Sequence, residues 1–423
     1  MCWVRWLKAA VAGETKASAA RRLIALGQIG QPAWTPRRFD RFADEGYRKN
    51  VIAFRGVNEV AQAAASVPLR LERRRRGRLV ALDDHPLLAL LRRPNPLQGG
   101  PGLFEALHAY RLIAGNAFVE AVAPETGRPP VELYALRPDR MTVIPGAAGI
   151  PAAYRYAVGG RQRDFPVDQL GGGSAILHLR AFHPRDDWYG QSPVEAAAFA
   201  IDQHNQAGAW NQAMLQNGAR PSGALMVKTS ADGAPASLGD DQFERLKEQI
   251  DQLYAGPGNA GRPILLEGGL TWQEMSLSPK DMDFINAKHT AARDIALAFG
   301  VPPQLLGIPG DNTYANMREA RLALWEETVI PLVRHFAAEL GRWLGPRFGE
   351  GLDLVPDLDR VPALSLRRER LWARLARADF LTVNEKRAEI GYPPVAGGDV
   401  VQARRPRDRA PSPPTDTGAA GSS

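Results

Sequence analysis

Residues 192–218, SPVEAAAFAIDQHNQAGAWNQAMLQNG, contain the helix signals that decide the fold of this chain. Ser192 is suited to the N-cap, Pro193 to the first helical position, and Glu195 to the acidic partner position of a capping box. Gly218 can adopt the left-handed conformation that ends many helices. The stretch therefore predicts one long helix of about 25 residues.

Residues 278–300, SPKDMDFINAKHTAARDIALAFG, begin with the same signals. Ser278, Pro279 and Asp281 are the expected cap, first residue and capping partner, and Gly300 is the expected stop. The segment between the two helices contains a strand-like, a helix-like and a second strand-like run: GALMVKT, DDQFERLKEQIDQLYAG and RPILLEGGLTWQEM. The sequence thus predicts two capped helices that enclose a small mixed insert.

Residues 301–312, VPPQLLGIPGDN, are rich in proline and glycine and are expected to form a loop. Helical spacing returns in the next stretch, TYANMREARLALWEETVIPLVRHFAAELGRWLG. Pro331 lies inside this third helix. Because proline lacks the backbone donor and crowds the preceding turn, we expect a kink there.

The remaining segments predict a mixed protein of the α+β class. A helix is expected over residues 47–67, a hairpin in VPLRLERRRRGRLVAL, and two short helices between residues 86 and 113. Residues 116–179 contain several short β-type runs between Gly, Pro and Asp residues. One more strand in LDLVPDL and short helices follow, and the Pro- and Arg-rich tail is expected to be disordered.

Composition limits the class of protein. The chain has 423 residues, 44% of them apolar, which is enough for one large core or several smaller ones. Its one cysteine, Cys2, excludes internal disulfides and multi-cysteine zinc sites. Residues 3–11 are expected to form an amphipathic helix and not a secretion signal, and we find no apolar run of transmembrane length. We therefore expect a soluble protein made in the cytoplasm.

The charges are unevenly distributed along the chain. Residues 1–78 carry a net charge of +11, the last 57 residues carry +4, and the centre carries −8. Basic ends around an acidic centre differ from the charge distribution of a uniformly basic nucleic-acid-binding protein. Ordinary solvated charge would explain this distribution as well. The cluster from Arg73 to Arg76 could contact nucleic acid or a neighbouring protein, or could be a solvated hairpin tip.

A search for catalytic groups finds no convincing set. Val194 replaces the second glycine of a nucleophile elbow around Ser192, and the glycines at 171–173 lack the lysine of a phosphate loop. We therefore expect that the protein is not an enzyme and that it binds no cofactor. The best candidates for a metal site are His178, His183, Asp186 and Asp187, but their spacing matches no known motif, and His178 is expected to be a partly buried strand residue. A metal-dependent nucleic-acid-processing enzyme that uses residues 178–187 is the main alternative.

Several unrelated segments, in order, resemble the portal proteins of long-tailed phages and gene transfer agents. They are DDWYGQSPVEAA, NGARPSGAL, GRPILLEGGLTWQEMSLSPKDMDF, AFGVPPQLLG and TYANMREARLALWEETVIPL, preceded by RRPNP, GNAF and LRPDRM. The resemblance covers roughly residues 40–345. A head-to-tail adaptor, another ring-forming protein, would usually be much shorter.

The resemblance implies a portal fold, with a mixed wing domain, a two-helix stem, a small α/β clip, a long kinked wing helix and a short helical crown. The expected boundaries are: arm 1–40, first part of the wing 41–191, stem helices 192–219 and 278–300, clip 220–277, tunnel loop 301–312, second part of the wing 313–364, crown 365–403, and disordered tail 404–423.

The resemblance also implies a dodecameric ring through which double-stranded DNA passes without sequence recognition. The implied partners are the terminase large subunit, a head-tail adaptor protein and the major capsid protein, with no membrane. Such a ring would be assembled in the host cytoplasm and located at the portal vertex of a virion or gene-transfer-agent particle. The DNA-channel candidates are Lys288, His289, Arg293, Gln304 and Asn312. The candidates for docking a partner on the clip are Asp240, Asp241, Glu244, Glu248 and Asp251.

Overall fold

The computed structural model describes residues 39–401, except 76–77, 126–127, 147–148, 169, 171–172, 217–222, 228–240, 242–243, 246–269, 275–283, 311–313 and 393. The chain divides into two compact units. Unit 1 consists of Met1–Val57, Leu112–Asn116 and Ala181–Phe299, and unit 2 consists of Asn58–Arg111, Ala117–Arg180 and Gly300–Ser423. Among the described residues, no helix is both long and apolar enough to cross a membrane.

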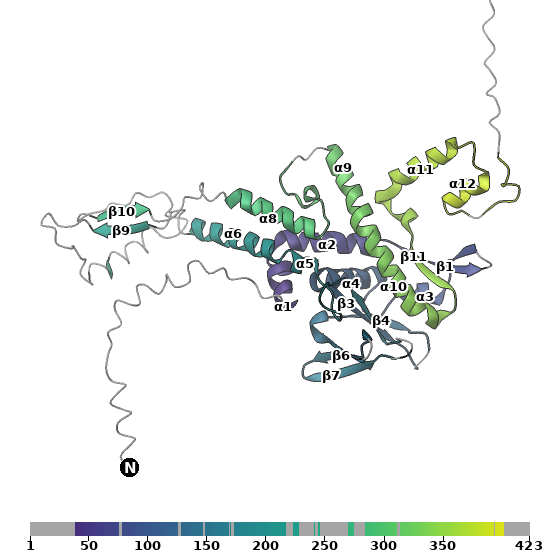
Figure 1. Ribbon diagram of the computed structural model, residues 1–423, viewed down its shortest axis with the longest axis horizontal. Coiled ribbons are helices and arrows are strands. Elements are labelled where there is room, and N and C mark those ends of the chain that lie inside the picture. Colours follow the sequence, from purple (N-terminus) through teal and green to yellow (C-terminus); the bar gives the residue numbers. More distant parts are fainter. Residues whose placement is uncertain are drawn as a thin grey trace, which may run out of the picture. The chain divides into compact units, whose positions relative to one another are not determined.

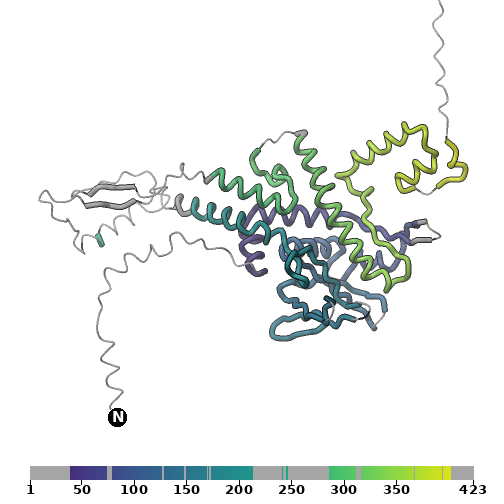
Figure 2. Tube along the Cα trace, in the orientation of Figure 1, coloured from purple at the N-terminus to yellow at the C-terminus, as the bar shows by residue number. Residues whose placement is uncertain are grey.

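Unit 1 is mainly helical. Its helices α6 and α8 pack side by side, as Figures 1 and 2 show, and strands β9 and β10 form an antiparallel pair with Leu270 opposite Val227. The elements are α1 (Phe39–Arg41), η2 (Phe42–Arg48), the start of α2 (Val51–Ala65), α5 (Pro193–Ala196), α6 (Ala198–Gln216), β9 (Gly223–Val227), β10 (Leu270–Glu274) and α8 (Phe284–Ala298).

The predicted helix over residues 192–218 is interrupted in the structure. Ser192 caps its start as expected, since its Oγ accepts a hydrogen bond of 2.9 Å from the backbone N–H of Glu195. The backbone leaves the helical range at Ala197, with φ −85° and ψ 3°, so that the four-residue α5 precedes α6. The stop at Gly300 is confirmed by its positive φ of 64°. The expected caps Gly218 and Ser278 lie outside the described residues.

A glycine crossing joins two distant segments of unit 1. Gly115 has φ +73°, and a Cβ built on it would lie 2.1 Å from the carbonyl oxygen of Gly190. A Cβ on Gly190 would likewise lie 2.2 Å from the carbonyl oxygen of Gly115. Only glycine at both positions allows the two backbones to approach so closely.

The Asn116 side chain fixes this crossing. Its Oδ1 accepts a hydrogen bond of 2.8 Å from the Gly190 N–H, and its Nδ2 donates to the carbonyl of Ala114 at 2.8 Å. The backbone N–H of Ala181 donates to the carbonyl of Gly115 at 2.8 Å. The crossing thus joins the GNAF and WYGQSP segments of the sequence.

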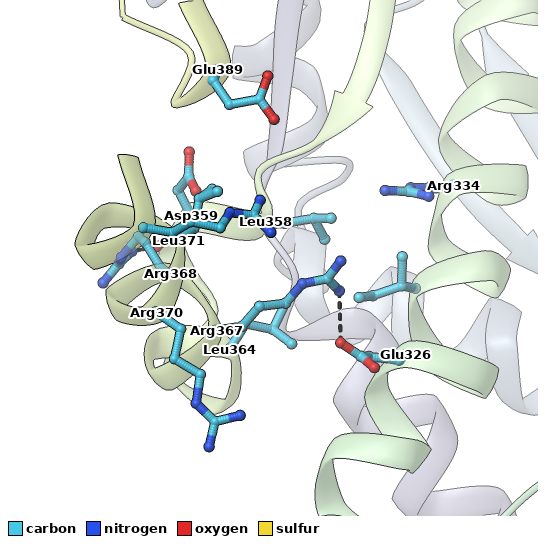
Figure 3. A pocket seen from close by; sticks show the side chains of 12 residues that line it. Glu326, Arg334, Leu358, Asp359, Leu364, Arg367, Arg368, Arg370, Leu371 and Glu389 are labelled. Atoms are coloured by element: carbon cyan, nitrogen blue, oxygen red, sulfur yellow. Dashed lines mark hydrogen bonds and ion pairs between the residues drawn. The ribbon is translucent and has the colours of Figure 1, made fainter. Parts of the chain in front are cut away.

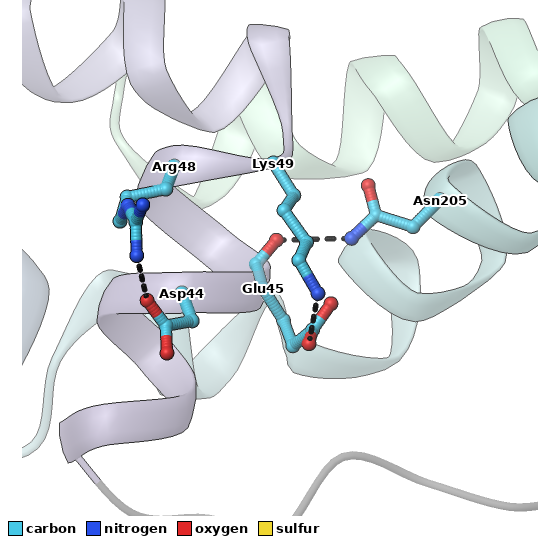
Figure 4. A network of polar contacts seen from close by, with 5 residues as sticks. All are labelled: Asp44, Glu45, Arg48, Lys49 and Asn205. Atoms are coloured by element: carbon cyan, nitrogen blue, oxygen red, sulfur yellow. Dashed lines mark hydrogen bonds and ion pairs between the residues drawn. The ribbon is translucent and has the colours of Figure 1, made fainter.

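A polar network joins three helices of unit 1. Asn50 caps α2, because its Oδ1 accepts hydrogen bonds from the backbone N–H groups of Ile52 and Ala53, and its Nδ2 donates to Asn205 Oδ1 on α6 at 2.9 Å. Asn205 in turn donates to the carbonyl of Glu45 in η2 at 2.9 Å (Figure 4). This network ties the ends of η2 and α2 to α6.

Two ion pairs within η2 and its C-cap lie beside this network. Arg48 pairs with Asp44 and Lys49 pairs with Glu45, each at 2.8 Å (Figure 4). Both pairs are largely solvent exposed, so we assign them a minor part in stability.

Unit 2 contains three small sheets, with strand orders β11-β1-β2, β4-β3-β8 and β5-β6-β7. The predicted hairpin over residues 67–82 is confirmed, and Leu71 of β1 is paired with Leu82 of β2 and with Leu354 of β11. The strands are β1 (Leu69–Arg75), β2 (Arg78–Leu82), β3 (Asn116–Val122), β4 (Glu132–Leu136), β5 (Met141–Ile144), β6 (Ala153–Val158), β7 (Arg161–Pro166), β8 (Ile176–Arg180) and β11 (Leu352–Pro356).

The core of unit 2 forms where α3, α4 and α10 pack on two of these sheets. Leu340 and Leu344 of α10 are fully buried, one helical turn apart, in the same apolar cluster as Leu71 and Leu133. A Cβ on Gly341 would lie 3.1 Å from the Leu354 side chain, so the glycine allows β11 to pack closely on α10. The helices are α3 (Pro86–Arg92), α4 (Gly100–Ala114), which ends in unit 1, and α10 (Ile330–Phe348).

The long helix predicted after residue 312 is present but carries its irregularity earlier than expected. A π-helical segment, η7 (Leu324–Val329), connects α9 (Tyr314–Ala323) to α10. Pro331 lies in the first turn of α10, directly after this segment. Since a proline ring crowds the carbonyl four residues earlier, the wider π turn accommodates it.

The remaining described elements are short helices. α12 begins with a full capping box, in which Thr382 and Glu385 bond to each other's backbone N–H groups. These elements are η3 (Pro138–Arg140), η6 (Pro303–Leu306), η8 (Leu358–Arg360), η9 (Pro362–Leu364), α11 (Ser365–Arg377) and α12 (Val383–Glu389).

We predict that Asn116→Ala destabilises the protein by about 1–3 kcal/mol, because it leaves the buried Gly190 N–H without its acceptor. Chemical denaturation measures the change. Gln206→Ala, on the exposed side of α6, is the matched control and should change the free energy of unfolding little. Equal effects of the two substitutions would contradict a special role for the crossing.

Candidate nucleic-acid interface

Of the three cationic candidates on α8, His289 and Arg293 are four residues apart and are neighbours on the helix, whereas Lys288 lies on another side of it. Lys288 and His289 are half-buried, whereas Arg293 is exposed. Burial, with a smaller contribution from the positive charge of Lys288, lowers the pKa of His204 on α6, the helix that packs against α8. Arg293, five residues further on, is rotated by about 140° from Lys288. Arg293 is therefore the member of the trio that α8 presents to solvent.

The predicted tunnel loop is shaped by two glycines and a short 3₁₀ helix. Thr328 Oγ1 donates a hydrogen bond of 2.7 Å to the carbonyl of Gly300, which anchors the start of the loop. η6 follows and ends at Gly307, which has φ +72°. Gln304 is half-buried, and its Oε1 has no hydrogen-bond partner among the described residues. Asn312, the other loop candidate, lies outside the described residues.

The acidic docking candidates are described only in part. Asp241 and Glu244 are exposed. Asp240, Glu248 and Asp251 lie outside the described residues. The role of this group stays a prediction.

The residues of the alternative metal site have other uses in the structure. His183 Nδ1 accepts a hydrogen bond from the backbone N–H of Arg185, and Asp186 Oδ1 accepts from those of Trp188 and Tyr189. Asp186 thus stabilises a turn, as aspartates commonly do. Within the described ranges, no group of three or more His, Cys, Asp or Glu side chains is arranged to hold a metal ion.

His178 is partly buried on β8, as predicted. Its ring stacks on Phe118 at a centroid distance of 4.2 Å and meets the edge of Tyr154 at 5.8 Å. Burial, with a smaller contribution from the charge of Arg180, lowers the pKa of His178 to about 3. The imidazole is therefore neutral in the folded protein at neutral pH and packs as an aromatic ring.

Sequence reasoning did not identify an arginine-lined pocket in unit 2. It has a volume of about 820 Å³ and lies between α11 on one side and η7 and α10 on the other (Figure 3). Arg334 projects from α10, and α11 supplies Arg367, Arg368, Arg370 and Arg374. The signal in the sequence was the run SLRRERLWARLAR, in which Arg367, Arg370, Arg374 and Arg377 recur every three or four residues.

Comparison with known proteins assigns the chain to a family. The sequence model of the phage portal protein family matches residues 52–391. The chain belongs to the phage portal protein family. The family prediction is thereby confirmed, and portal proteins are structural proteins.

Individual relatives agree with this assignment. The chain is 47% identical over 359 residues to an uncharacterised protein of Rickettsia bellii (strain RML369-C), covering 85% of this chain and 91% of that protein. It is 24% identical over 326 residues to the portal protein of Enterobacteria phage HK97, covering 75% and 72% of the two chains.

Solved structures give the same result for the fold. A chain from the virion of a native gene transfer agent particle is 47% identical, with a TM-score of 0.64 and coverage of 89% of this chain and 100% of that chain. An HK97-family portal protein from Corynebacterium diphtheriae, 17% identical, has a TM-score of 0.54 and coverage of 78% and 99%. The α+β class is confirmed and is that of the HK97-type portal fold.

We predict that His178→Phe makes the protein less sensitive to acid. Between the unfolded pKa of about 6.5 and the folded pKa of about 3, protons bind the unfolded chain better, so the wild type loses stability as pH falls. From about pH 6 to about pH 5 the variant should lose about 1 kcal/mol less than the wild type.

Denaturation at both pH values measures this difference. An equal loss of stability in the two proteins would show that His178 becomes protonated in the folded state. Above about pH 8, His178 is neutral in both the folded and the unfolded state. Denaturation there measures how replacing imidazole by phenyl changes packing, without any contribution from protonation.

Proposed function

We propose that this chain forms the portal ring of a gene-transfer-agent or phage particle, through which double-stranded DNA passes during packaging and exit. The observation that carries this proposal is the 47% identity, over 89% of the chain, to a protein of the gene transfer agent virion. A chain with the same identity occurs in the neck of a native particle computed with C12 symmetry. A dodecamer is therefore the expected assembly of this chain.

The parts of the ring follow from the order of the elements. α6 and α8, which pack together, are proposed as the stem helices, with the clip between them at residues 220–277. The β9 and β10 pair belongs to this clip. The wing would consist of residues 41–191 and 313–364. The tunnel loop would be residues 301–312 and the crown residues 365–403. The arm, 1–40, and the tail, 404–423, are assigned to none of these parts.

The proposed channel must let DNA slide. Each phosphate that a cation neutralises adds affinity through counterion release, so a dense ring of cations would hold the DNA in place. The centre of the chain carries a net charge of −8. Of the three α8 candidates, Arg293 is exposed and the other two are half-buried. Both observations are compatible with weak contact between the channel and DNA. Gln304 and Asn312 are the proposed polar contacts of the loop.

The clip is the proposed docking site for the terminase large subunit and the head-tail adaptor. Its acidic candidates would supply charge complementarity, which mainly guides the encounter between partners. The exposure of Asp241 and Glu244 supports this role. The basic N-terminal region is proposed to contact the major capsid protein or packaged DNA.

We predict that the purified full-length protein forms closed rings of about a dozen 46.1 kDa chains. Negative-stain electron microscopy reveals the ring and its central hole, and light scattering gives the mass. A monodisperse monomer or dimer in several buffers would overturn the proposal. So would nucleotide hydrolysis by the pure protein, because the energy for packaging is assigned to the terminase.

A further inference from the structure

The arginine-lined pocket of unit 2 is an open depression with both polar and apolar lining residues. Arg334 and Glu326 come from α10 and η7, and the facing wall is α11 (Figure 3). The volume of about 820 Å³ exceeds what a single small ion requires and falls in the range of sites for larger ligands. Among the described residues that line it, none is aromatic, so the pocket offers no ring on which a base could stack.

The pocket has an excess of positive charge. Five arginines line it, against the three acidic residues Glu326, Asp359 and Glu389. Glu326 is already paired with Arg367 at 2.7 Å, and Arg368 donates to the backbone carbonyl of Asp359. The pocket therefore has more guanidinium groups than its own acidic groups can neutralise.

Three of its arginines are free to bind a ligand. Within the part of the chain that the structure describes, the guanidinium groups of Arg334, Arg370 and Arg374 form no hydrogen bond or ion pair. All three residues are exposed. Because arginine donates in a planar fork that fits phosphate oxygens, a phosphate-bearing ligand is the natural partner of this set.

The arginines on α11 form a regular row. Arg367, Arg370 and Arg374 are three and four residues apart and so lie on one helical face. Their positions along the helix axis differ by about 4.5 and 6 Å. A DNA strand carries a phosphate about every 3.4 Å of its axis, so long, flexible arginine side chains on such a row can reach neighbouring phosphates of one strand.

We propose that this pocket binds the phosphate backbone of double-stranded DNA, through Arg370 and Arg374 of α11 and Arg334 of α10. The inference rests on the proposed portal function only for the source of the DNA. The regular row, the missing aromatic platform and the unpaired arginines favour the backbone of a duplex over a nucleotide or an acidic peptide. The contact is independent of base sequence and separate from the residues proposed for the channel.

The test is DNA binding by the full-length protein carrying Arg370→Gln and Arg374→Gln. Fluorescence anisotropy with a short labelled duplex, repeated at several salt concentrations, gives the affinity and its salt dependence. We expect a loss of affinity of about tenfold or more, and a salt slope smaller by about 2. Arg334→Gln, on the facing helix, should cause a smaller loss in the same direction.

The matched control is the double variant Arg161→Gln and Arg185→Gln, which removes the same charge from exposed residues outside the pocket. It should bind the duplex like the wild type. An unchanged affinity in the Arg370 and Arg374 variant, or an equal loss in the control, would overturn the proposal.

Light scattering of the same samples separates this inference from the portal proposal. Intact rings with weakened DNA binding would support the proposal that the pocket binds DNA. Intact rings with unchanged DNA binding would contradict that proposal and leave the portal function unaffected. Loss of the rings with DNA binding retained would assign the arginines to contacts between subunits. Competition by tripolyphosphate or polyglutamate as effective as that of unlabelled duplex would assign the pocket to a small polyphosphate or an acidic peptide.

Discussion

The close crossing of two backbones at Gly115 and Gly190 is the constraint on which the architecture of unit 1 depends. Neither position has room for a Cβ, and the Asn116 side chain satisfies the polar groups that the crossing buries. The chain enters unit 1 at residue 112 and again at residue 181, so the crossing joins the two entering segments directly. Ser192, two residues beyond Gly190, then starts α5 in a fixed position.

Unit 2 depends on a comparable close approach, between Gly341 of α10 and Leu354 of β11. Burial of Leu340 and Leu344 on either side stabilises the contact through the hydrophobic effect. The same helix carries Arg334 on its exposed side, so one element contributes both to the core and to the arginine-lined pocket. Rigid support of this kind suits a site that must keep a fixed spacing.

Local signals explain why much of the fold could be predicted from the sequence. Ser192 and Gly300 act through their own backbone and nearest neighbours, and the hairpin near Gly77 follows from the alternation of residues around it. The contact of Asn50 with Asn205 on α6 joins segments 155 residues apart, so no local pattern encodes it.

The candidate site also has features that the sequence predicts and features that only packing between distant segments determines. Helical spacing placed Lys288 and Arg293 on one helix, but only the contact of α8 with α6 determines which of them is exposed. The pocket opposite α11 needs η7 and α10 as its other wall, and these elements precede α11 by dozens of residues. The π turn of η7 also affects the helical phase, because it holds one residue more than an α-helical turn would and absorbs it in a wider turn. Deleting one residue from η7 would convert it to an α-helical turn and leave the phase between α9 and α10 unchanged, whereas deleting one residue from α10 would rotate the two sides by about 100° relative to each other.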